Sequence, residues 1–305
     1  MLVLKERQTG FTMMELLTVL VIISLLLGIL IPSMNTIRKA AKNAKQKAQF
    51  AAISIALTAF KGDDGDYPDS EQSAGDYGGA QKLAEAIVGW DLMGFHPDST
   101  WDSGGGAYDA DDPCNLDARM GFYIDRDKAG AHWLGDDIGD SGRPGLFKVT
   151  GPLSDRFVIC DSFGRRNLLI GGKAVRAGSP ILYYKADPSQ KAVDYTDLFA
   201  SDSGTYDYRD NYDIVRLGKV TSDGVNDGTP ADDHPNYTAN PDAPAVGEIT
   251  SFYYYIADRV ATEASTTLGM GGSIWRSHNP DTYILISAGA DGEYGTADDI
   301  TNFGD

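Results

Sequence analysis

An acidic, glycine-rich segment in the C-terminal part of the sequence has the residue types of a cation site. Residues 287–300 read SAGADGEYGTADDI and follow directly on an apolar run. Calcium takes six to eight oxygen ligands from carboxylates and main-chain carbonyls, and glycines let the backbone fold around an ion. The aspartates Asp291, Asp298 and Asp299 therefore predict a calcium site, with a solvated acidic loop as the alternative.

Other acidic segments carry a weaker signal. Residues 222–233 read SDGVNDGTPADD and repeat the pattern loosely, which leaves a second cation site open. Asp109, Asp111 and Asp112 lack the glycine of an EF-hand loop, so we expect them to face solvent.

No catalytic motif accompanies these loops. The sequence contains no G-x-S-x-G, H-E-x-x-H, Walker A or C-x-x-C pattern, and its four histidines are scattered. We therefore expect no enzyme activity. The two cysteines, Cys114 and Cys160, are expected either to form a disulfide, if the domain lies outside the cytoplasm, or to remain two buried thiols.

The charge is unevenly distributed along the 305 residues. The net charge is −18, yet residues 1–50 carry seven basic and two acidic residues, a net +5, so the remaining residues sum to −23. A chain this acidic repels phosphate, which argues against a nucleic-acid partner. The basic, apolar start and the acidic body are suited to different surroundings.

An apolar run of 21 residues, 11–31, contains a single charge, Glu15. A helix of that length spans about 30 Å, the hydrocarbon thickness of a bilayer. A cleaved secretory signal would be shorter and end in a small-residue site. A plain membrane anchor leaves Glu15 unexplained, because a lone carboxylate in lipid is costly.

A third interpretation accounts for Glu15. The stretch from Gly10 through Phe11 to Glu15 resembles the class III signal of type IV pilins and type II secretion pseudopilins. The resemblance implies a leader at 1–10, cleavage between Gly10 and Phe11 by prepilin peptidase, and N-methylation of Phe11. It also implies that Glu15 meets the N-terminal amine of a neighbouring subunit in a fibre, and that Pro32 kinks the helix.

The charge flanking the apolar run disagrees with this interpretation. Five basic residues follow the run shortly, against Lys5 and Arg7 before it, so the positive-inside rule would place the C-terminal side in the cytoplasm. The resemblance instead implies a single-pass inner-membrane protein with a periplasmic head. We give the cleavage motif more weight than the charge count.

The resemblance implies an α+β fold of the type IV pilin kind, with a long kinked N-terminal helix packed on an antiparallel sheet. A helix is predicted over about 12–60, with a bulky face of Phe50, Ile53, Leu57 and Phe60 for docking on the sheet, and a shorter helix over 80–95. Aromatic and β-branched runs predict strands at 156–160, 180–185, 251–256 and 282–287.

The predicted organisation has three parts: the leader, a transmembrane or filament-core half at 11–35, and a head at 36–305. Long Gly- and Asp-rich insertions are expected at about 96–150 and 187–248. The segment 60–68 resembles the one that follows the long helix in major pseudopilins. A second resemblance, at 161–184, is interrupted by about 15 residues, which leaves the strand pairing there open.

Residues 287–300 resemble the C-terminal calcium loop of major pseudopilins. That resemblance implies five ligands for Ca²⁺: Ala288, Asp291, Glu293, Asp298 and Asp299. The family implies a structural role in a type II secretion pseudopilus, with the chain itself, prepilin peptidase, the inner-membrane assembly platform and minor pseudopilins as partners, and membrane lipid before assembly. The alternative is a type IV pilin or minor pilin on the cell surface.

Overall fold

The computed structural model divides the chain into two compact units, Met1–Ala44 and Lys45–Asp305. The residues it describes are 11–72, 78–97, 119–135, 144–147, 156–190, 193–194, 204–215, 217, 252–253, 255–258, 260–262 and 274–304.

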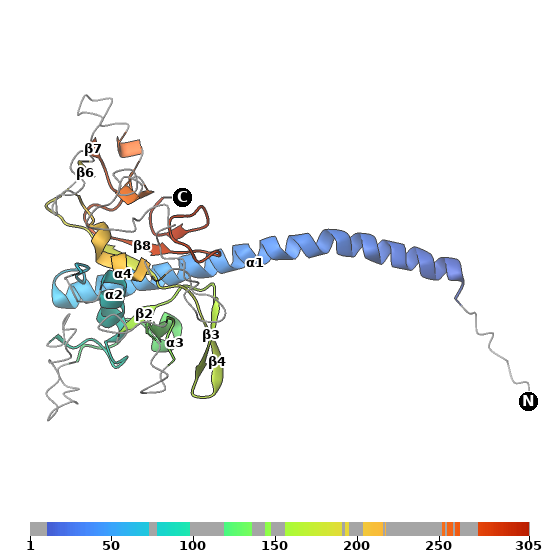
Figure 1. Cartoon of the computed structure of the whole chain (residues 1–305), viewed down its shortest axis with the longest axis horizontal. Coiled ribbons are helices and arrows are strands. Elements are labelled where there is room, and N and C mark those ends of the chain that lie inside the picture. The colour runs from blue at the N-terminus through green and yellow to red at the C-terminus, as the bar shows by residue number, and fades with distance from the viewer. Residues whose placement is uncertain are drawn as a thin grey trace, which may run out of the picture. The chain divides into compact units, whose positions relative to one another are not determined.

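Helix α1 (Met13–Asp64) is the longest element, with 52 residues, and it continues through Pro32 without a break (Figure 1). It ends where Gly65 takes a φ of +95°, a value that favours glycine. The predicted helix of 12–60 is thus confirmed, while the kink at Pro32 stays a prediction. Its stretch Met13–Leu30, of mean hydropathy 2.6, is exposed throughout, and by length and composition it could cross a membrane.

The later part of α1 lies in the second unit and docks through one face. Phe50, Ile53, Leu57 and Phe60 are at most 3% exposed, whereas Ile55, on the opposite side, is 71% exposed. This is the face that the sequence predicted. It packs against Leu83 and Ile87 of α2 (Gly79–Val88) and against one face of a sheet.

The central sheet consists of β5 (Leu182–Lys185), β8 (Tyr283–Ser287) and β9 (Ile300–Thr301), antiparallel and with β8 in the middle. Leu182 is opposite Ile286, and Ser287 is opposite Ile300. An isolated bridge between Cys160 and Pro180 connects β5 to the pair β1 (Ala131–Trp133) and β2 (Phe157–Ile159). The strands predicted at 156–160, 180–185 and 282–287 are confirmed.

Both faces of this sheet are covered, which explains why β8 is buried at every position. Successive side chains of a strand point to opposite faces. Tyr183 and Leu285 accordingly pack with α1, whereas Tyr184 and Ile284 belong to a second apolar cluster. That cluster also contains buried side chains from 204–217 and 252–256. Described residues between 204 and 217, within the predicted insertion 187–248, therefore contribute to the core.

Two expectations need correction, and the strand pairing that was left open at 161–184 is resolved. The aromatic run at 251–256 was predicted as a strand, but Phe252, Tyr253 and Tyr255 are helical and cover the sheet with their rings. The predicted helix over 80–95 ends at Val88, because Gly89 adopts a φ of +87°. The 15 residues expected to interrupt the 161–184 segment form a hairpin of β3 (Arg166–Ile170) and β4 (Lys173–Ala177), and β5 still pairs with β8.

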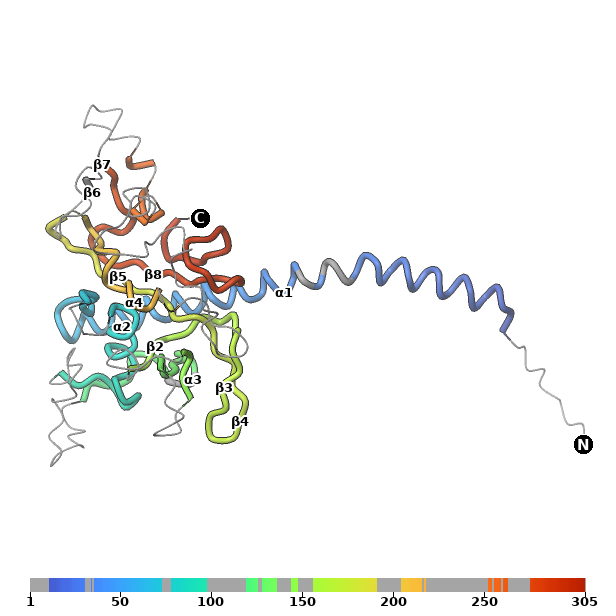
Figure 2. Tube along the Cα trace, viewed as in Figure 1, coloured from blue at the N-terminus to red at the C-terminus, as the bar shows by residue number. Residues whose placement is uncertain are grey.

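The remaining elements are short. They are α3 (Arg126–Ala129), the 3₁₀ helix η5 (Tyr208–Asn211), α4 (Tyr212–Val215), and the pair β6 (Val193–Asp194) with β7 (Ile274–Trp275). Figure 2 shows the same elements as a trace, in which the turn of the β3–β4 hairpin stands clear of the other described segments of its unit.

Candidate functional site

The N-terminus of α1 is capped by reciprocal hydrogen bonds between Thr12 and Glu15. Glu15 Oε2 accepts from the backbone N–H of Thr12 at 2.9 Å and from its hydroxyl at 2.8 Å, and the N–H of Glu15 donates to Thr12 Oγ1 at 3.3 Å. This is a capping box, in which a threonine and a glutamate three residues later satisfy free donors of the first helical turn. The carboxylate of Glu15 thus has partners within its own chain.

The C-terminal loop between β8 and β9 folds tightly around the side chain of Asp298. Asp298 Oδ2 accepts from the backbone N–H groups of Ala290 at 2.5 Å and Asp291 at 3.0 Å, and Oδ1 accepts from the Thr296 hydroxyl at 2.8 Å. Gly289 has a φ of +62°, and a Cβ there would lie 2.2 Å from the carbonyl oxygen of Asp298. Only glycine fits this close approach.

Asp299, which lies within 3.5 Å of the same Thr296 hydroxyl, has two further donors. Its Oδ2 accepts from the N–H of Gly295 at 2.6 Å and from the hydroxyl of Tyr255 at 2.9 Å. Tyr255 belongs to the segment wrongly predicted as a strand, so no local pattern indicated that it would reach this loop. On another side, the Arg165 side chain packs so closely on Gly292 that a Cβ there would meet Nε at 2.7 Å.

The carboxyl groups of the loop influence one another. Burial raises the pKa of Asp299 to about 7, and the nearby charges of Asp291 and Asp298 act in the same direction. Burial and the contact with Asp298 also raise the pKa of Asp291. Burial alone would raise the pKa of Asp298, but its contact with Asp291 and its hydrogen bonds bring that pKa below the ordinary value. Such crowding of negative charge is what a bound cation relieves.

The donor set fits calcium in kind, since the predicted ligands are carboxylates and main-chain carbonyls on a glycine-turned loop. The positions of these ligands match a calcium site only in part. Asp291 and Asp298 meet, but nowhere in the described part of the chain do three His, Cys, Asp or Glu side chains gather as a metal site would require. Asp298 and Asp299 instead accept N–H groups of the loop, so calcium would have to turn their carboxylates outwards.

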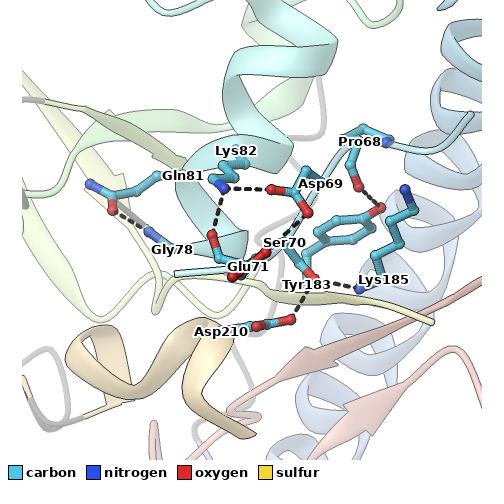
Figure 3. Close-up of polar contacts among 10 residues, drawn as sticks. All are labelled: Pro68, Asp69, Ser70, Glu71, Gly78, Gln81, Lys82, Tyr183, Lys185 and Asp210. Atoms are coloured by element: carbon cyan, nitrogen blue, oxygen red, sulfur yellow. Dashed lines mark hydrogen bonds and ion pairs between the residues drawn. The ribbon is translucent and has the colours of Figure 1, made fainter. Parts of the chain in front are cut away.

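A buried polar cluster, which was not predicted from the sequence, connects the segment after α1 to the sheet through hydrogen bonds and an ion pair (Figure 3). Lys82 Nζ contacts Asp69 at 2.7 Å and the carbonyl of Glu71 at 2.5 Å. The Ser70 hydroxyl donates to Asp210 at 2.5 Å and accepts from the backbone N–H of Lys185 at 2.9 Å.

The same cluster contains two fully buried groups. The Tyr183 hydroxyl donates to the carbonyl of Pro68 at 2.7 Å. Burial raises the pKa of Asp210 well above its ordinary value, so this carboxyl favours the protonated form. Because these contacts link four separate segments of the head, we interpret the cluster as structural and not as catalytic.

Several predicted site residues lie outside the described residues: Gly10, Cys114, Asp109, Asp111, Asp112 and the segment 222–233. Phe11 lies within them and is 83% exposed. Cys160 is buried and its thiol is free in the structure, and burial raises its pKa. The Cys114–Cys160 disulfide therefore stays a prediction.

Comparisons with known proteins address the N-terminal motif directly. A family model described as "Prokaryotic N-terminal methylation motif" matches residues 5–31. The core protein G of the type II secretion system from Aeromonas hydrophila is 34% identical over 68 residues, which is 22% of this chain and 48% of that protein. Over these residues the chain is similar to core protein G of the type II secretion system.

Two further relatives carry the same name. The type II secretion system core protein G of Dickeya chrysanthemi is 31% identical over 72 residues, 24% of this chain and 47% of the relative. The Klebsiella pneumoniae protein is 33% identical over 67 residues, which is 22% of this chain and 48% of the relative. The chain thus spans about half the length of the curated relatives it matches. No solved structure gives a significant match.

These findings confirm the resemblance to pseudopilins that was drawn from Gly10, Phe11 and Glu15. The long helix followed by small antiparallel sheets fits an α+β, pilin-like architecture. Roughly three quarters of the chain lies outside each match to a relative. The roles of the individual residues in the C-terminal loop therefore depend on the geometry described above.

Proposed function

We propose that this protein is a structural, non-catalytic subunit of a type II secretion pseudopilus. Prepilin peptidase cuts it between Gly10 and Phe11, Phe11 is N-methylated, and the mature chains assemble into a helical fibre that supports protein export. The observation that carries the proposal is the methylation motif at residues 5–31, together with relatives named core protein G of that system.

Before assembly the chain is held in the inner membrane by Met13–Leu30, with its head in the periplasm. The capping box gives Glu15 a partner during this stage, because the N–H and the hydroxyl of Thr12 both donate to its carboxylate. This lowers the cost of a carboxylate in lipid. In the fibre the methylated amine of a neighbouring Phe11 replaces Thr12, and that charge-assisted pair sets the stagger between subunits.

Calcium is part of the proposal for the C-terminal loop. Asp291, Asp298 and Asp299 would supply carboxylates, and Ala288 and Glu293 main-chain carbonyls. The crowding of the three aspartates supports this, as does Gly289, which lets the loop close on Asp298. When bound, the ion would hold the loop between β8 and β9 in one conformation.

The other proposed partners follow from the same family relationship. They are prepilin peptidase, the inner-membrane assembly platform and minor pseudopilins. Intact-mass measurement tests the first step: protein from a host with prepilin peptidase should begin at Phe11 and carry one additional methyl group. A host without the peptidase should yield the uncut chain. A mature N-terminus after Ile31 would instead indicate an ordinary secretory signal and would contradict the proposal.

A surface pilin or minor pilin remains the second candidate. The observation in its favour is the size of the head, since the curated relatives match only 22–24% of this chain. Imaging decides between the two: fibres confined to the envelope at native expression support the pseudopilus, and fibres on the cell surface support the pilin.

A further inference from the structure

The β3–β4 hairpin exposes apolar side chains at its turn end. Its two strands pair in register from Arg166 opposite Ala177 to Ile170 opposite Lys173, and Gly171 and Gly172, both with positive φ, form the turn. Leu168 is buried in the core. Leu169, however, is 67% exposed and Ile170 is 42% exposed, in the part of the hairpin that stands clear in Figure 2.

The hairpin is also basic in a strongly acidic protein. No Asp or Glu occurs between Asp161 and Asp187, although the chain beyond residue 50 carries a net charge of −23. Lys173 and Arg176 are exposed, and neither forms an ion pair with any residue of the described chain. We use the name hairpin tip for Leu169, Ile170 and Lys173, which lie beside the turn, together with Arg176, which lies nearer the base opposite Asn167.

A second surface, at the C-terminal end of α1, combines exposed apolar side chains with negative charges. Asp63 and Asp64 are exposed at the C-terminal end of α1. The Tyr123 hydroxyl donates to Asp63 at 2.9 Å, which places the neighbouring Phe122, 56% exposed, near these carboxylates. Met93, 53% exposed, lies on the segment whose Phe95 carbonyl accepts from the N–H of Met120. We call Asp63, Asp64, Met93 and Phe122 the acidic end.

The two surfaces are separated along α1. The N–H of Ser162, shortly before the hairpin, donates to Gln46 at 2.7 Å, and the carbonyl of Cys160 accepts from Gln49 at 2.9 Å. The base of the hairpin is therefore level with residues 46–49, whereas the acidic end is level with residues 63–64. At 1.5 Å per residue this is a separation of about 25 Å along the helix.

We propose that the hairpin tip of one subunit docks on the acidic end of a second copy of this chain. Each surface combines exposed apolar side chains with charges of one sign, and the signs are opposite. Two different, complementary surfaces that lie apart on one head give a heterologous contact, which can repeat without closing and so produce a filament. The proposal rests on the fibre proposed above and identifies one contact between its heads.

A charge exchange in the full-length chain tests this contact. Lys173→Glu with Arg176→Glu should reduce the yield of sheared fibres about tenfold in a host with prepilin peptidase and the assembly platform, a change that corresponds to about 1.4 kcal/mol. Adding Asp63→Lys and Asp64→Lys to the same chain should restore the yield, because the opposite charges then face each other again. A wild-type yield from the first variant, or no recovery in the combined one, would overturn the proposal.

An apolar pair of variants provides the matched control. Leu169→Ser should lower fibre yield, whereas Val260→Ser, at a side chain 80% exposed outside both surfaces, should not. Equal yields from these two variants would also overturn the proposal. Thermal melting of each variant shows whether the head is folded. If the processed wild-type chain itself forms no fibres, the proposed function fails, and that result is distinct from a loss confined to the hairpin variants.

Discussion

Tyr255 connects the C-terminal loop to the aromatic segment that covers the sheet. Its hydroxyl donates to Asp299 at 2.9 Å, and its ring lies edge-on to Phe303 at 6.1 Å. Tyr255→Phe keeps the ring but leaves a largely buried carboxyl with one donor fewer. Because a hydrogen bond to a charged group is worth about 1.5–3 kcal/mol, we expect a loss of roughly that size in the free energy of unfolding.

Urea unfolding of the full chain in detergent measures this loss. Tyr67→Phe is the matched control, since the Tyr67 hydroxyl has no hydrogen-bond partner among the described residues, and its removal should change stability by less than about 0.5 kcal/mol. Equal effects of the two substitutions would mean that the Tyr255–Asp299 contact contributes nothing.

Asp161 is a second residue with a measurable consequence. Burial raises its pKa to about 7, although the N–H of Phe163 at 3.0 Å and the Ser287 hydroxyl at 3.1 Å donate to it, and Arg165 is a nearby positive charge. The folded state therefore keeps this proton up to about pH 7, whereas the unfolded chain releases it near pH 4. The stability that Asp161 contributes is present at low pH and is lost as the pH rises through that window.

Asp161→Asn should remove this dependence. Between pH 4.5 and 7.5 the free energy of unfolding of the wild type should fall by on the order of 2–4 kcal/mol relative to the variant. Asp207 and Asp210, whose pKa values burial also raises, occur in both proteins and cancel in the difference. Parallel pH profiles of wild type and variant would contradict the assignment.

At the scale of elements, the docking face of α1 shows what periodicity can predict. Phe50, Ile53, Leu57 and Phe60 recur at helical spacing, so the buried face was evident before the structure. Leu57→Ala should destabilise the head by about 2–5 kcal/mol, because it leaves a cavity in a fully buried position. Ile55→Ala, on the exposed side, should cost less than about 0.5 kcal/mol. Urea unfolding compares the two, and equal losses would contradict the docking.

Other elements were missed for identifiable physical reasons. The run at 251–256 has strand-forming residues, but what fixes its conformation is the packing of Phe252 and Tyr253 on a sheet distant in sequence. The hairpin at 166–177 did carry a signal, since Gly171-Gly172 between two apolar runs favours a two-residue turn. Tyr206, Tyr208 and Tyr212 could likewise have indicated a buried segment within 187–248.

The residue types of the C-terminal loop allowed a calcium site to be predicted from the sequence. The directions in which its side chains point could not be predicted. That Asp298 turns inwards onto backbone N–H groups depends on how the loop closes, and the partner of Asp299 is a residue 44 positions away. Long-range contacts of this kind leave no local pattern in a single sequence.

At the scale of the whole molecule, the calcium proposal predicts a gain in thermal stability. A ligand that binds only the folded state at a hundredfold excess over Kd adds about 2.7 kcal/mol, on the order of 5 °C in Tm for a head of this size. The full chain in detergent should therefore melt higher in calcium than in EGTA. Asp298→Ala with Asp299→Ala should abolish the difference, and Asp232→Ala with Asp233→Ala should preserve it. Identical melting curves, with no calcium uptake by isothermal titration, would remove the ion from the proposal.

The central position of β8 also affects the order in which the protein acquires its structure during synthesis. Its partner β5 ends at Lys185, and β8 begins only at Tyr283, so the ribosome adds about 100 residues between the two. At 5–20 residues per second this takes about 5–20 s. Throughout that interval α1 is already complete, yet the sheet on which it docks lacks its middle strand. If the chain is inserted as proposed, its membrane segment is available for insertion well before the head can close, and the apolar docking face of α1 stays incompletely covered until then.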